Sequence, residues 1–257
     1  MKVDRRGFLK IGGLAVAGVF TKPVFDVFSS LRLSEIKPSE KALVGHRWAM
    51  VVNTQTCLAE DGCKDCIEVC HQLHNVPDFG NPKDEIKWIW TLPFKEAFHG
   101  QEHEFIKEDL KDMPVPVLCN QCDNPACVSV CPTRATWRRE DGIVMMDYHR
   151  CIGCRYCMAA CPYGARSFNW SNPDPFIDKG NPDFPTRTRG VVEKCNFCRE
   201  RLVKGLMPGC VEACKEKALI FGDLEDPNSE IREALRTHYS ISRKPNLGTK
   251  PQVYYLV

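Results

Sequence analysis

The chain has 257 residues, and 16 of them are cysteine, roughly three to four times the share in an average protein. Its 35 basic and 33 acidic side chains leave a formal net charge of +2, which gives no reason to expect a nucleic-acid partner. With 43% hydrophobic residues the composition excludes a disordered chain, and the length allows a core that needs no disulfides. The cysteines therefore require another explanation.

The N-terminus has the pattern of an export signal. Arg5 and Arg6 are adjacent and precede a weakly apolar, Gly- and Ala-rich run over residues 11–20. This pattern resembles a twin-arginine signal, and the run is shorter than the roughly 20 residues that a membrane-spanning helix needs. We expect residues 1–33 to be a cleaved signal or an uncleaved tether, with an ordinary basic tail as the alternative. The protein would then lie in the periplasm or on the exoplasmic face of the cytoplasmic membrane, peripheral to the bilayer.

The cysteines fall into four groups of four with none left over. In chain order they are Cys57, Cys63, Cys66, Cys70; Cys119, Cys122, Cys127, Cys131; Cys151, Cys154, Cys157, Cys161; and Cys195, Cys198, Cys210, Cys214. The third group has the C-x2-C-x2-C-x3-C-P spacing of bacterial ferredoxins, in which three close thiolates hold one cubane and the fourth reaches another. This spacing predicts [4Fe-4S] clusters, four in all.

The other groups vary this spacing. The second and fourth keep two residues in the first gap and three in the last, with four and eleven residues in the middle gap. The first group has five residues between Cys57 and Cys63, which makes Cys57 the least regular ligand. A ligand from Asp61 or His71, or a three-iron cluster, is the alternative there.

Zinc and disulfides explain the cysteines less well. Zinc sites use two C-x2-C pairs separated by a dozen or more residues, whereas the third group places three cysteines within seven residues. Disulfides form in exported proteins, but a chain of this size has little need of eight. The twin-arginine pattern resembles the signals of proteins that are exported already folded. In such a protein the clusters can be inserted before export.

Several elements can be placed in chain order. Strands are expected at 48–52 and 218–221, and an Asp141–Gly142 turn between β-favouring stretches predicts a hairpin. Trp88 and Trp90 alternate as on a strand and are expected in the core or an interface. The long stretches 71–118 and 162–194 are candidates for partner surface or for solvated covering loops. His71 and His74 share a helical face and are expected at the surface or beside a cluster.

Positive charges lie near the cysteines in sequence. They are Arg134, Arg155, Arg166, Arg199 and Arg201. Cationic groups favour the reduced, more negative cluster and so raise its potential. Sixteen thiolates and four oxidised clusters would change the net charge to about −6. No nucleotide-binding motif and no catalytic pair of carboxylates stands out, so we expect no catalytic residue.

The spacing of the four groups, together with ALIFGDLEDPNSEI from Ala218 and the ending NLGTKPQVYYLV, resembles the four-cluster electron-transfer subunits of the dimethyl sulfoxide reductase type. The resemblance covers roughly residues 48–257. It implies an α+β, duplicated ferredoxin-like fold, one two-cluster unit inserted in another, with loop insertions. The expected parts are 34–118 (first half of the outer unit and an insertion), 119–170 (inner unit), 171–225 (insertion and closing half) and 226–257 (C-terminal extension).

The same resemblance implies how the cysteines pair. Cys119, Cys122 and Cys127 would share a cluster with Cys161, and Cys151, Cys154 and Cys157 one with Cys131. The outer groups would pair likewise, as Cys57, Cys63 and Cys66 with Cys214, and Cys195, Cys198 and Cys210 with Cys70.

Such subunits carry electrons and have no substrate chemistry of their own. The implied partners are an NrfD-like, multi-helix, quinone-interacting membrane subunit and a multihaem cytochrome c or a molybdopterin subunit. The chain's own export signal and the CHQLHN extension of the first group resemble the ferredoxin subunits of DsrMKJOP-type complexes of sulfur metabolism. The iron-sulfur subunit of a periplasmic molybdopterin reductase, for polysulfide or tetrathionate, is the alternative, and an exported metal-binding or disulfide scaffold is a distant one.

Overall fold

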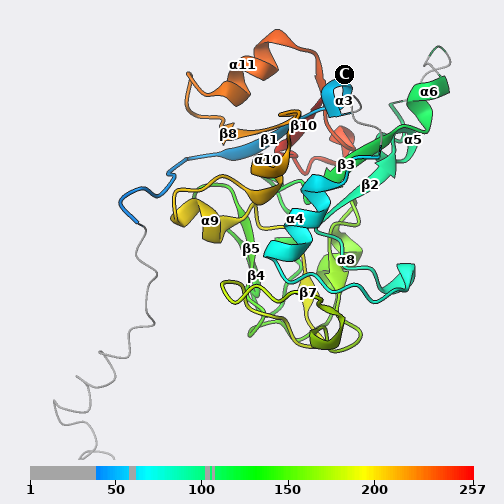
Figure 1. Cartoon of the computed structure of the whole chain (residues 1–257), viewed down its shortest axis with the longest axis vertical. Coiled ribbons are helices and arrows are strands. Elements are labelled where there is room, and N and C mark those ends of the chain that lie inside the picture. Colours follow the sequence, from blue (N-terminus) through cyan, green and yellow to red (C-terminus); the bar gives the residue numbers. More distant parts are fainter. Residues whose placement is uncertain (1–38, 58–61, 102–104, 106–107) are drawn as a thin grey trace, which may run out of the picture. The chain divides into compact units, whose positions relative to one another are not determined.

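The computed structural model describes residues 39–57, 62–101, 105 and 108–257. The expected signal at 1–33 and Asp61 lie outside the described residues. Figure 1 shows the helices and strands of the chain and labels most of them. In order they are β1 (Trp48–Asn53), α3 (Thr54–Cys57), α4 (Asp65–Leu73), η1 (Pro82–Asp84), β2 (Ile89–Pro93), α5 (Phe94–Ala97), α6 (Glu108–Lys111), β3 (Pro114–Leu118), α7 (Ala126–Ser129), β4 (Thr136–Arg138), β5 (Val144–Met146), α8 (Tyr156–Ala160), β6 (Ser167–Phe168), η2 (Asp174–Phe176), β7 (Val192–Glu193), α9 (Arg199–Val203), α10 (Gly209–Ala213), β8 (Leu219–Asp223), α11 (Glu230–Thr237), β9 (Ser240–Ile241), η3 (Pro245–Leu247) and β10 (Val253–Leu256).

The largest sheet is built around β1 and has the strand order β8-β1-β10-β9 (Figure 1). β1 runs antiparallel to β8 and parallel to β10, so the two predicted strands are confirmed and pair with each other. Successive side chains of β1 point to opposite faces. Trp48, Met50 and Val52 belong to the main core, whereas Ala49 and Val51 pack against α11. Because both faces are covered, β1 is apolar at every position from 48 to 52.

The predicted hairpin is also confirmed. β4 and β5 pair in antiparallel register, and the turn between them contains Asp141 and Gly142. Gly142 has a φ of +86°, which a residue without a Cβ adopts most readily. The Asp141 carboxylate accepts a hydrogen bond from the Ile143 N–H at 3.2 Å and steadies the turn.

The stretch 71–118 is less of a loop than its length suggests. It contains the antiparallel pair β2–β3, and Ile89 on β2 is buried opposite Leu118 on β3. Trp88 is fully buried and Trp90 nearly so, as expected for core packing. The hairpin therefore contributes core, and only parts of this insertion are free to act as a covering surface.

Short helices follow or precede the cysteines and pack in two pairs. α4 lies against α10, and α7 lies against α8. At the first contact Gly209 stands so close to Leu73 that a Cβ at 209 would overlap that side chain. This mixture of short helices and small sheets agrees with the expected α+β class and brings segments far apart in sequence together at the cysteines.

Candidate cluster-binding sites

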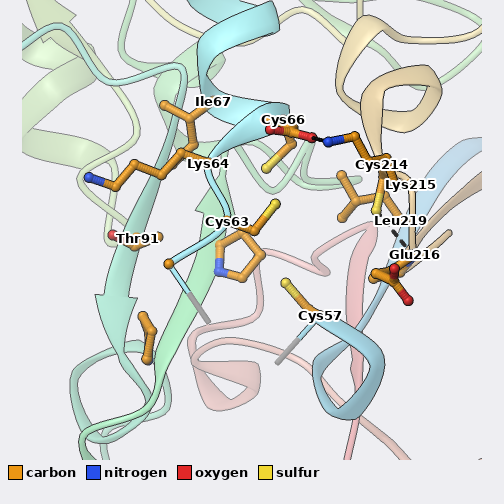
Figure 2. Close-up of a pocket in the computed structure, with 15 residues that line it drawn as sticks. Cys57, Cys63, Lys64, Cys66, Ile67, Thr91, Cys214, Lys215, Glu216 and Leu219 are labelled. Carbon is orange, nitrogen blue, oxygen red and sulfur yellow. Dashed lines mark hydrogen bonds and ion pairs between the residues drawn. The ribbon is translucent and has the colours of Figure 1, made fainter. Parts of the chain in front are cut away.

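Four cysteines surround one cavity of about 180 Å³ beside α3, α4 and α10. They form site 1 and are Cys57, Cys63, Cys66 and Cys214. Figure 2 shows their sulfur atoms turned toward a common space. Burial, followed by the neighbouring Cys57 and Cys214 thiols, raises the pKa of the Cys66 thiol to about 12. Cys57 thus lies with the other three in spite of its irregular spacing, and His71 does not line this cavity.

Local structure explains where Cys57 lies. It ends α3, and the first residue of that helix, Thr54, donates its hydroxyl to the Leu256 carbonyl on β10 at 2.6 Å. The Asn53 side chain accepts from the Thr56 N–H at 3.1 Å. The short helix is therefore anchored to the end of the main sheet, and its last thiol faces Cys66 and Cys214.

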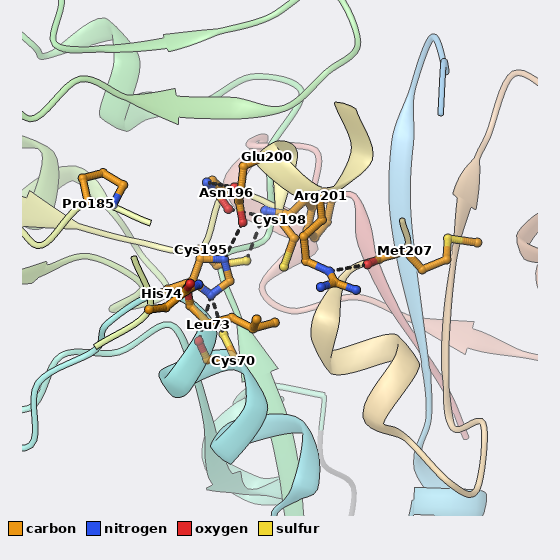
Figure 3. Close-up of polar contacts among 12 residues, drawn as sticks. Cys70, Leu73, His74, Pro185, Cys195, Asn196, Cys198, Glu200, Arg201 and Met207 are labelled. Carbon is orange, nitrogen blue, oxygen red and sulfur yellow. Dashed lines mark hydrogen bonds and ion pairs between the residues drawn. The ribbon is translucent and has the colours of Figure 1, made fainter. Parts of the chain in front are cut away.

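Site 2 lies in the interior. It consists of Cys70, Cys195, Cys198 and Cys210, and all four are buried. Burial and then the neighbouring thiols raise the pKa of Cys70 well above its usual value, and burial together with Cys119 raises that of Cys195 to about 12. Figure 3 shows Cys70 approaching Cys195 and Cys198 from α4.

Site 3 is formed by the second cysteine group and the last member of the third. Cys119, Cys122, Cys127 and Cys161 line one cavity together with Tyr163 and Thr249. Burial and the neighbouring Cys119 raise the pKa of Cys122 to about 12, although a hydrogen bond with Thr249 opposes the rise. The Tyr163 hydroxyl also contacts the Thr249 hydroxyl at 2.5 Å, which fixes this wall of the cavity.

Site 4 contains an exposed cysteine, as site 1 does. Cys131, Cys151, Cys154 and Cys157 line a further cavity with Ile152 and Arg155. Cys154 is exposed, as Cys63 is in site 1, whereas Cys157 is buried. Burial raises the pKa of the Cys157 thiol, and Arg166 opposes that rise. Site 4 therefore meets solvent on one side and the protein interior on the other.

The chemistry of these donor sets fits iron-sulfur clusters. Each site offers four sulfur atoms, and four neighbouring thiolates repel one another unless a cation lies between them. Iron supplies that cation, because thiolates are the ligands that [4Fe-4S] clusters use. The sixteen cysteines are divided among the four sites with none outside them.

Contacts between neighbouring cysteines link the four sites in succession. α4 carries Cys66 of site 1 and Cys70 of site 2 one turn apart. The Cys119 thiol of site 3 is close enough to raise the pKa of Cys195 in site 2. Cys127 of site 3 likewise acts on Cys157 of site 4. The order is therefore site 1, site 2, site 3, site 4, with an exposed cysteine at each end.

A buried histidine lies beside site 2. His74 is 1% exposed, and its Nδ1 donates to the Cys70 carbonyl at 2.8 Å while Nε2 contacts a Glu200 carboxylate oxygen at 2.9 Å. Figure 3 shows this chain of contacts. His74, Glu200 and Cys198 could together hold a metal ion, but Cys198 belongs to site 2. We therefore regard His74 as a neighbour of the site, as one expectation from sequence had it, and not as a surface group. His71 is half-buried, and burial lowers its pKa.

The arginines near the cysteines differ in what they contact. Arg166 is buried and donates to the Cys127 sulfur at 3.1 Å, between sites 3 and 4. Arg155 is exposed at site 4. Arg199 and Arg201 lie near the carboxylates of Asp141 and Glu212 instead, and Arg134 is exposed. Of these arginines, Arg166 contacts a cysteine sulfur and Arg155 lines the cavity of site 4.

Comparison with known proteins identifies the domains and the relatives. Residues 111–174 and 150–219 each match a 4Fe-4S dicluster domain. The chain is 38% identical to the Hdr-like menaquinol oxidoreductase iron-sulfur subunit 1 of Archaeoglobus fulgidus, over 98% of this chain and 97% of that protein. It is 40% identical to the menaquinone reductase iron-sulfur cluster-binding subunit of Nitratidesulfovibrio vulgaris (82% and 88%) and 34% identical to a tetrathionate reductase subunit of Salmonella typhimurium (100% and 89%).

The chain belongs to the iron-sulfur subunits of oxidoreductases. Like other iron-sulfur subunits it has ferredoxin-type domains of mixed α/β content, and its two dicluster matches and sixteen cysteines account for four [4Fe-4S] clusters. Its part in an oxidoreductase is electron transfer and not substrate chemistry. Within the described part of this iron-sulfur subunit, no helix is both long and apolar enough to cross a membrane.

Proposed function

We propose that sites 1 to 4 each hold one [4Fe-4S] cluster through their four cysteine thiolates. The grouping of all sixteen cysteines into four sets of four supports this ligation. A bound [4Fe-4S] cluster accepts and releases one electron at a time. The chain's own residues fix the spacing of the sites, exclude water from site 2, and set the charge around each site.

Metal analysis tests this ligation. We expect about sixteen irons and sixteen acid-labile sulfides per chain, since each cubane holds four of each. Cys57→Ser should alter one cluster, with loss of one iron or of the whole cluster, while Thr56→Ser on the same short helix should keep the full iron content. Zinc in place of iron, or full iron and unchanged cluster spectra in Cys57→Ser, would contradict the assignment.

The line of four sites supports a function as an electron wire between two partners. Sites 1 and 4 each contain an exposed cysteine, whereas the cysteines of site 2 are all buried. Electrons can therefore enter and leave at the two ends only where another subunit docks. We infer that one partner is an NrfD-like quinone-interacting membrane subunit and the other is a multihaem cytochrome c or a molybdopterin subunit, in a DsrMKJOP-type complex in which this chain corresponds to DsrO.

The two ends differ in character. At site 4 the exposed side chains of Ile152 (67%), Tyr156 (63%) and Trp170 (45%) are apolar or aromatic. At site 1 the lining of the cavity adds the charged residues Lys64, Asp65, Lys215 and Glu216 to apolar ones such as Ile67 and Leu219. Because an apolar surface suits a membrane-embedded partner, we propose that site 4 faces the quinone-linked subunit and site 1 the haem or catalytic subunit. Cross-linking from residue 156 to the membrane subunit tests this orientation, and links only to the other subunit would reverse it.

A second candidate function is that of the iron-sulfur subunit of a molybdopterin reductase. The match to the Salmonella tetrathionate reductase subunit, which extends over the whole of this chain, favours it. Affinity purification of the native complex separates the two functions. Haem c co-purifying with the chain supports the DsrMKJOP-type complex, and molybdenum co-purifying with it supports the reductase.

We also propose twin-arginine export to the periplasmic side and a duplicated ferredoxin fold. Export rests on Arg5 and Arg6, and replacement of both by lysine should leave the protein in the cytoplasm.

The duplication rests on the two helix pairs, α4 with α10 and α7 with α8, each of which carries cysteines of two sites. In that arrangement 119–170 is the inner unit, 34–118 and 171–225 form the outer unit, and 226–257 is the extension that supplies α11 and β10. An inner unit expressed alone that binds about eight irons would support the division, and one that binds none would oppose it.

A further inference from the structure

Lys194 is a buried cation that the cysteine pattern does not explain. It follows β7 and directly precedes Cys195, and it is 1% exposed. Its Nζ donates to the carbonyls of Val144 and Cys195, the latter at 2.6 Å. None of the ion pairs in the described part of the chain includes Lys194. A buried ammonium with only carbonyl partners is costly unless negative charge lies nearby.

The two carbonyls place Lys194 at the junction of the interior sites. Cys195 belongs to site 2, and Val144 lines the cavity of site 3. Gln121, which is fully buried, ties the same two segments together, because its Nε2 donates to the Cys195 carbonyl and its Oε1 accepts from the Val144 N–H, both at 2.8 Å. The ammonium is therefore held between sites 2 and 3 by contacts on both sides.

The adjacent carboxylate is directed elsewhere. Glu193 is fully buried, and its oxygens bind Arg187, the Trp88 indole N–H and the Asn169 amide. It is neutralised by Arg187 and is not the counter-charge of Lys194. The Cys195 thiol lies close enough to interact with the Lys194 ammonium, so the thiolates and clusters of the two sites supply negative charge beside it, and this charge grows when a cluster is reduced.

The next junction along the wire has the same construction. Arg166 is buried between sites 3 and 4, where it donates to the Cys127 sulfur at 3.1 Å and to the Thr136 hydroxyl at 2.8 Å. Burial opposes its charge, but the thiols of Cys127 and Cys157 outweigh that effect and raise the pKa of the guanidinium. Site 3 thus lies between two buried cations. Lys194 is at its junction with site 2, and Arg166 is at its junction with site 4.

We propose that Lys194 raises the reduction potentials of the clusters in sites 2 and 3, and that Arg166 does the same for sites 3 and 4. The proposal rests on the ligation stated above. Its physical basis is that a buried charge acts across a medium of low dielectric constant and is screened little by salt. The potential of the cluster in site 3 then depends on both cations. Both favour its reduced state, so we expect an electron within the wire to be held preferentially at site 3.

The test is a redox titration of the whole, iron-loaded protein followed by electron paramagnetic resonance. Lys194→Gln removes the charge and keeps an N–H donor for the two carbonyls. Arg166→Gln removes the positive charge at the junction of sites 3 and 4 and also keeps an N–H donor. Lys83→Gln, on the exposed helix η1, is the control. Each junction variant should lower two of the four midpoint potentials, with about a tenfold fall in the equilibrium constant for reduction, or about 59 mV for one electron. One of the lowered transitions should be common to both variants, and Lys83→Gln should lower none.

Three outcomes would overturn the proposal: unchanged potentials in an iron-replete Lys194→Gln, an equal fall of all four, or no transition shared with Arg166→Gln. If Lys194→Gln does not retain its iron, Gln121→Glu provides the same comparison, because it adds a negative charge at that junction and keeps Lys194. It should lower the same two potentials, and unchanged potentials there would also count against the proposal. Fewer than four clusters in the unmodified protein would instead mean that the ligation itself is wrong.

Discussion

Arg155 stands at the exposed end of the wire, between Cys154 and Cys157. It has a φ of +63°, and its guanidinium lies over the rings of Phe168 (5.4 Å) and Trp170 (4.7 Å). Cation–π contacts of this kind hold an otherwise mobile side chain in place. The charge therefore stays beside site 4, although solvent reaches it and screens it more than it screens Arg166.

Arg155→Glu should lower the potential of one cluster. The substitution reverses a charge at site 4 and so disfavours the reduced, more negative state. We expect a smaller fall than at the buried cations, and a fall that diminishes as salt is added. Redox titration at low and high ionic strength measures both effects. Arg236→Glu on the exposed face of α11 is the control, and an unchanged titration of Arg155→Glu would remove Arg155 from this role.

At the scale of single residues, the sequence predicts the ligand types well and their surroundings poorly. Cysteine spacing reflects the geometry of a cluster, so it is visible in one chain. The burial of Lys194 and the contact of His74 with Glu200 depend on segments 50 or more residues apart meeting in space. In the sequence, a lysine that precedes a C-x2-C pair looks the same whether its side chain is buried or exposed to solvent.

Helix contact at Gly209 fixes how the outer cysteine groups approach each other. α10 carries Cys210 and leads to Cys214, and α4 carries Cys66 and Cys70. The missing Cβ of Gly209 lets the two helices pack closely, with Val69 and Leu73 on the opposite side. Sites 1 and 2 both depend on this approach, because each combines a cysteine of α4 with one that lies on α10 or directly follows it.

Gly209→Ala should therefore destabilise the protein. A methyl group at 209 overlaps the Cδ1 atom of Leu73, so the Leu73 side chain would have to shift away from α10, at a cost of about 1–3 kcal/mol. For a chain of this size each kcal/mol lowers Tm by about 2–4 °C. Thermal unfolding followed by circular dichroism measures the change. Gly180→Ala, which has open space around its Cα, is the matched control, and an equal Tm in the two variants would contradict the packing argument.

Elements with local signals are predicted, and those made by distant pairing are missed. The Asp141–Gly142 turn and the apolar stretches at 48–52 and 218–221 contain their own evidence. The β2–β3 hairpin was not evident, because Pro114 and Pro116 on β3 argue against a strand. β10 pairs in parallel with β1, although the two strands lie far apart in the sequence. No local sequence pattern predicts this pairing.

Taken as a whole, the molecule is organised around its cysteines. The main core includes Cys70, Cys195 and Cys210, and further cysteines pack against it. Metal ligands that lie in the core couple metal binding to folding, because the site is not formed in the unfolded chain. The clusters are therefore expected to be part of the fold as well as of the electron path.

Removal of iron should unfold or loosen most of the chain. We expect loss of about 5 kcal/mol or more, which corresponds to a fall in Tm of at least about 10 °C, after anaerobic treatment with a chelator. Near-ultraviolet circular dichroism should lose its fixed aromatic signal, since Trp88 packs on His74 beside site 2. If the iron-free protein had the same Tm as the iron-loaded protein, the fold would not depend on the clusters, and this prediction would be wrong.

The crossed membership of the four sites also governs how the protein is made. Sites 3 and 4 draw on cysteines from 119 to 161 and are complete once that stretch has left the ribosome. Site 2 waits for Cys210 and site 1 for Cys214, and the main sheet waits for β10 (Val253–Leu256). Cys57, Cys63, Cys66 and Cys70, though synthesised first, are the thiols that stay longest without their partners, so the newborn chain depends on a reducing compartment until its last strand is in place.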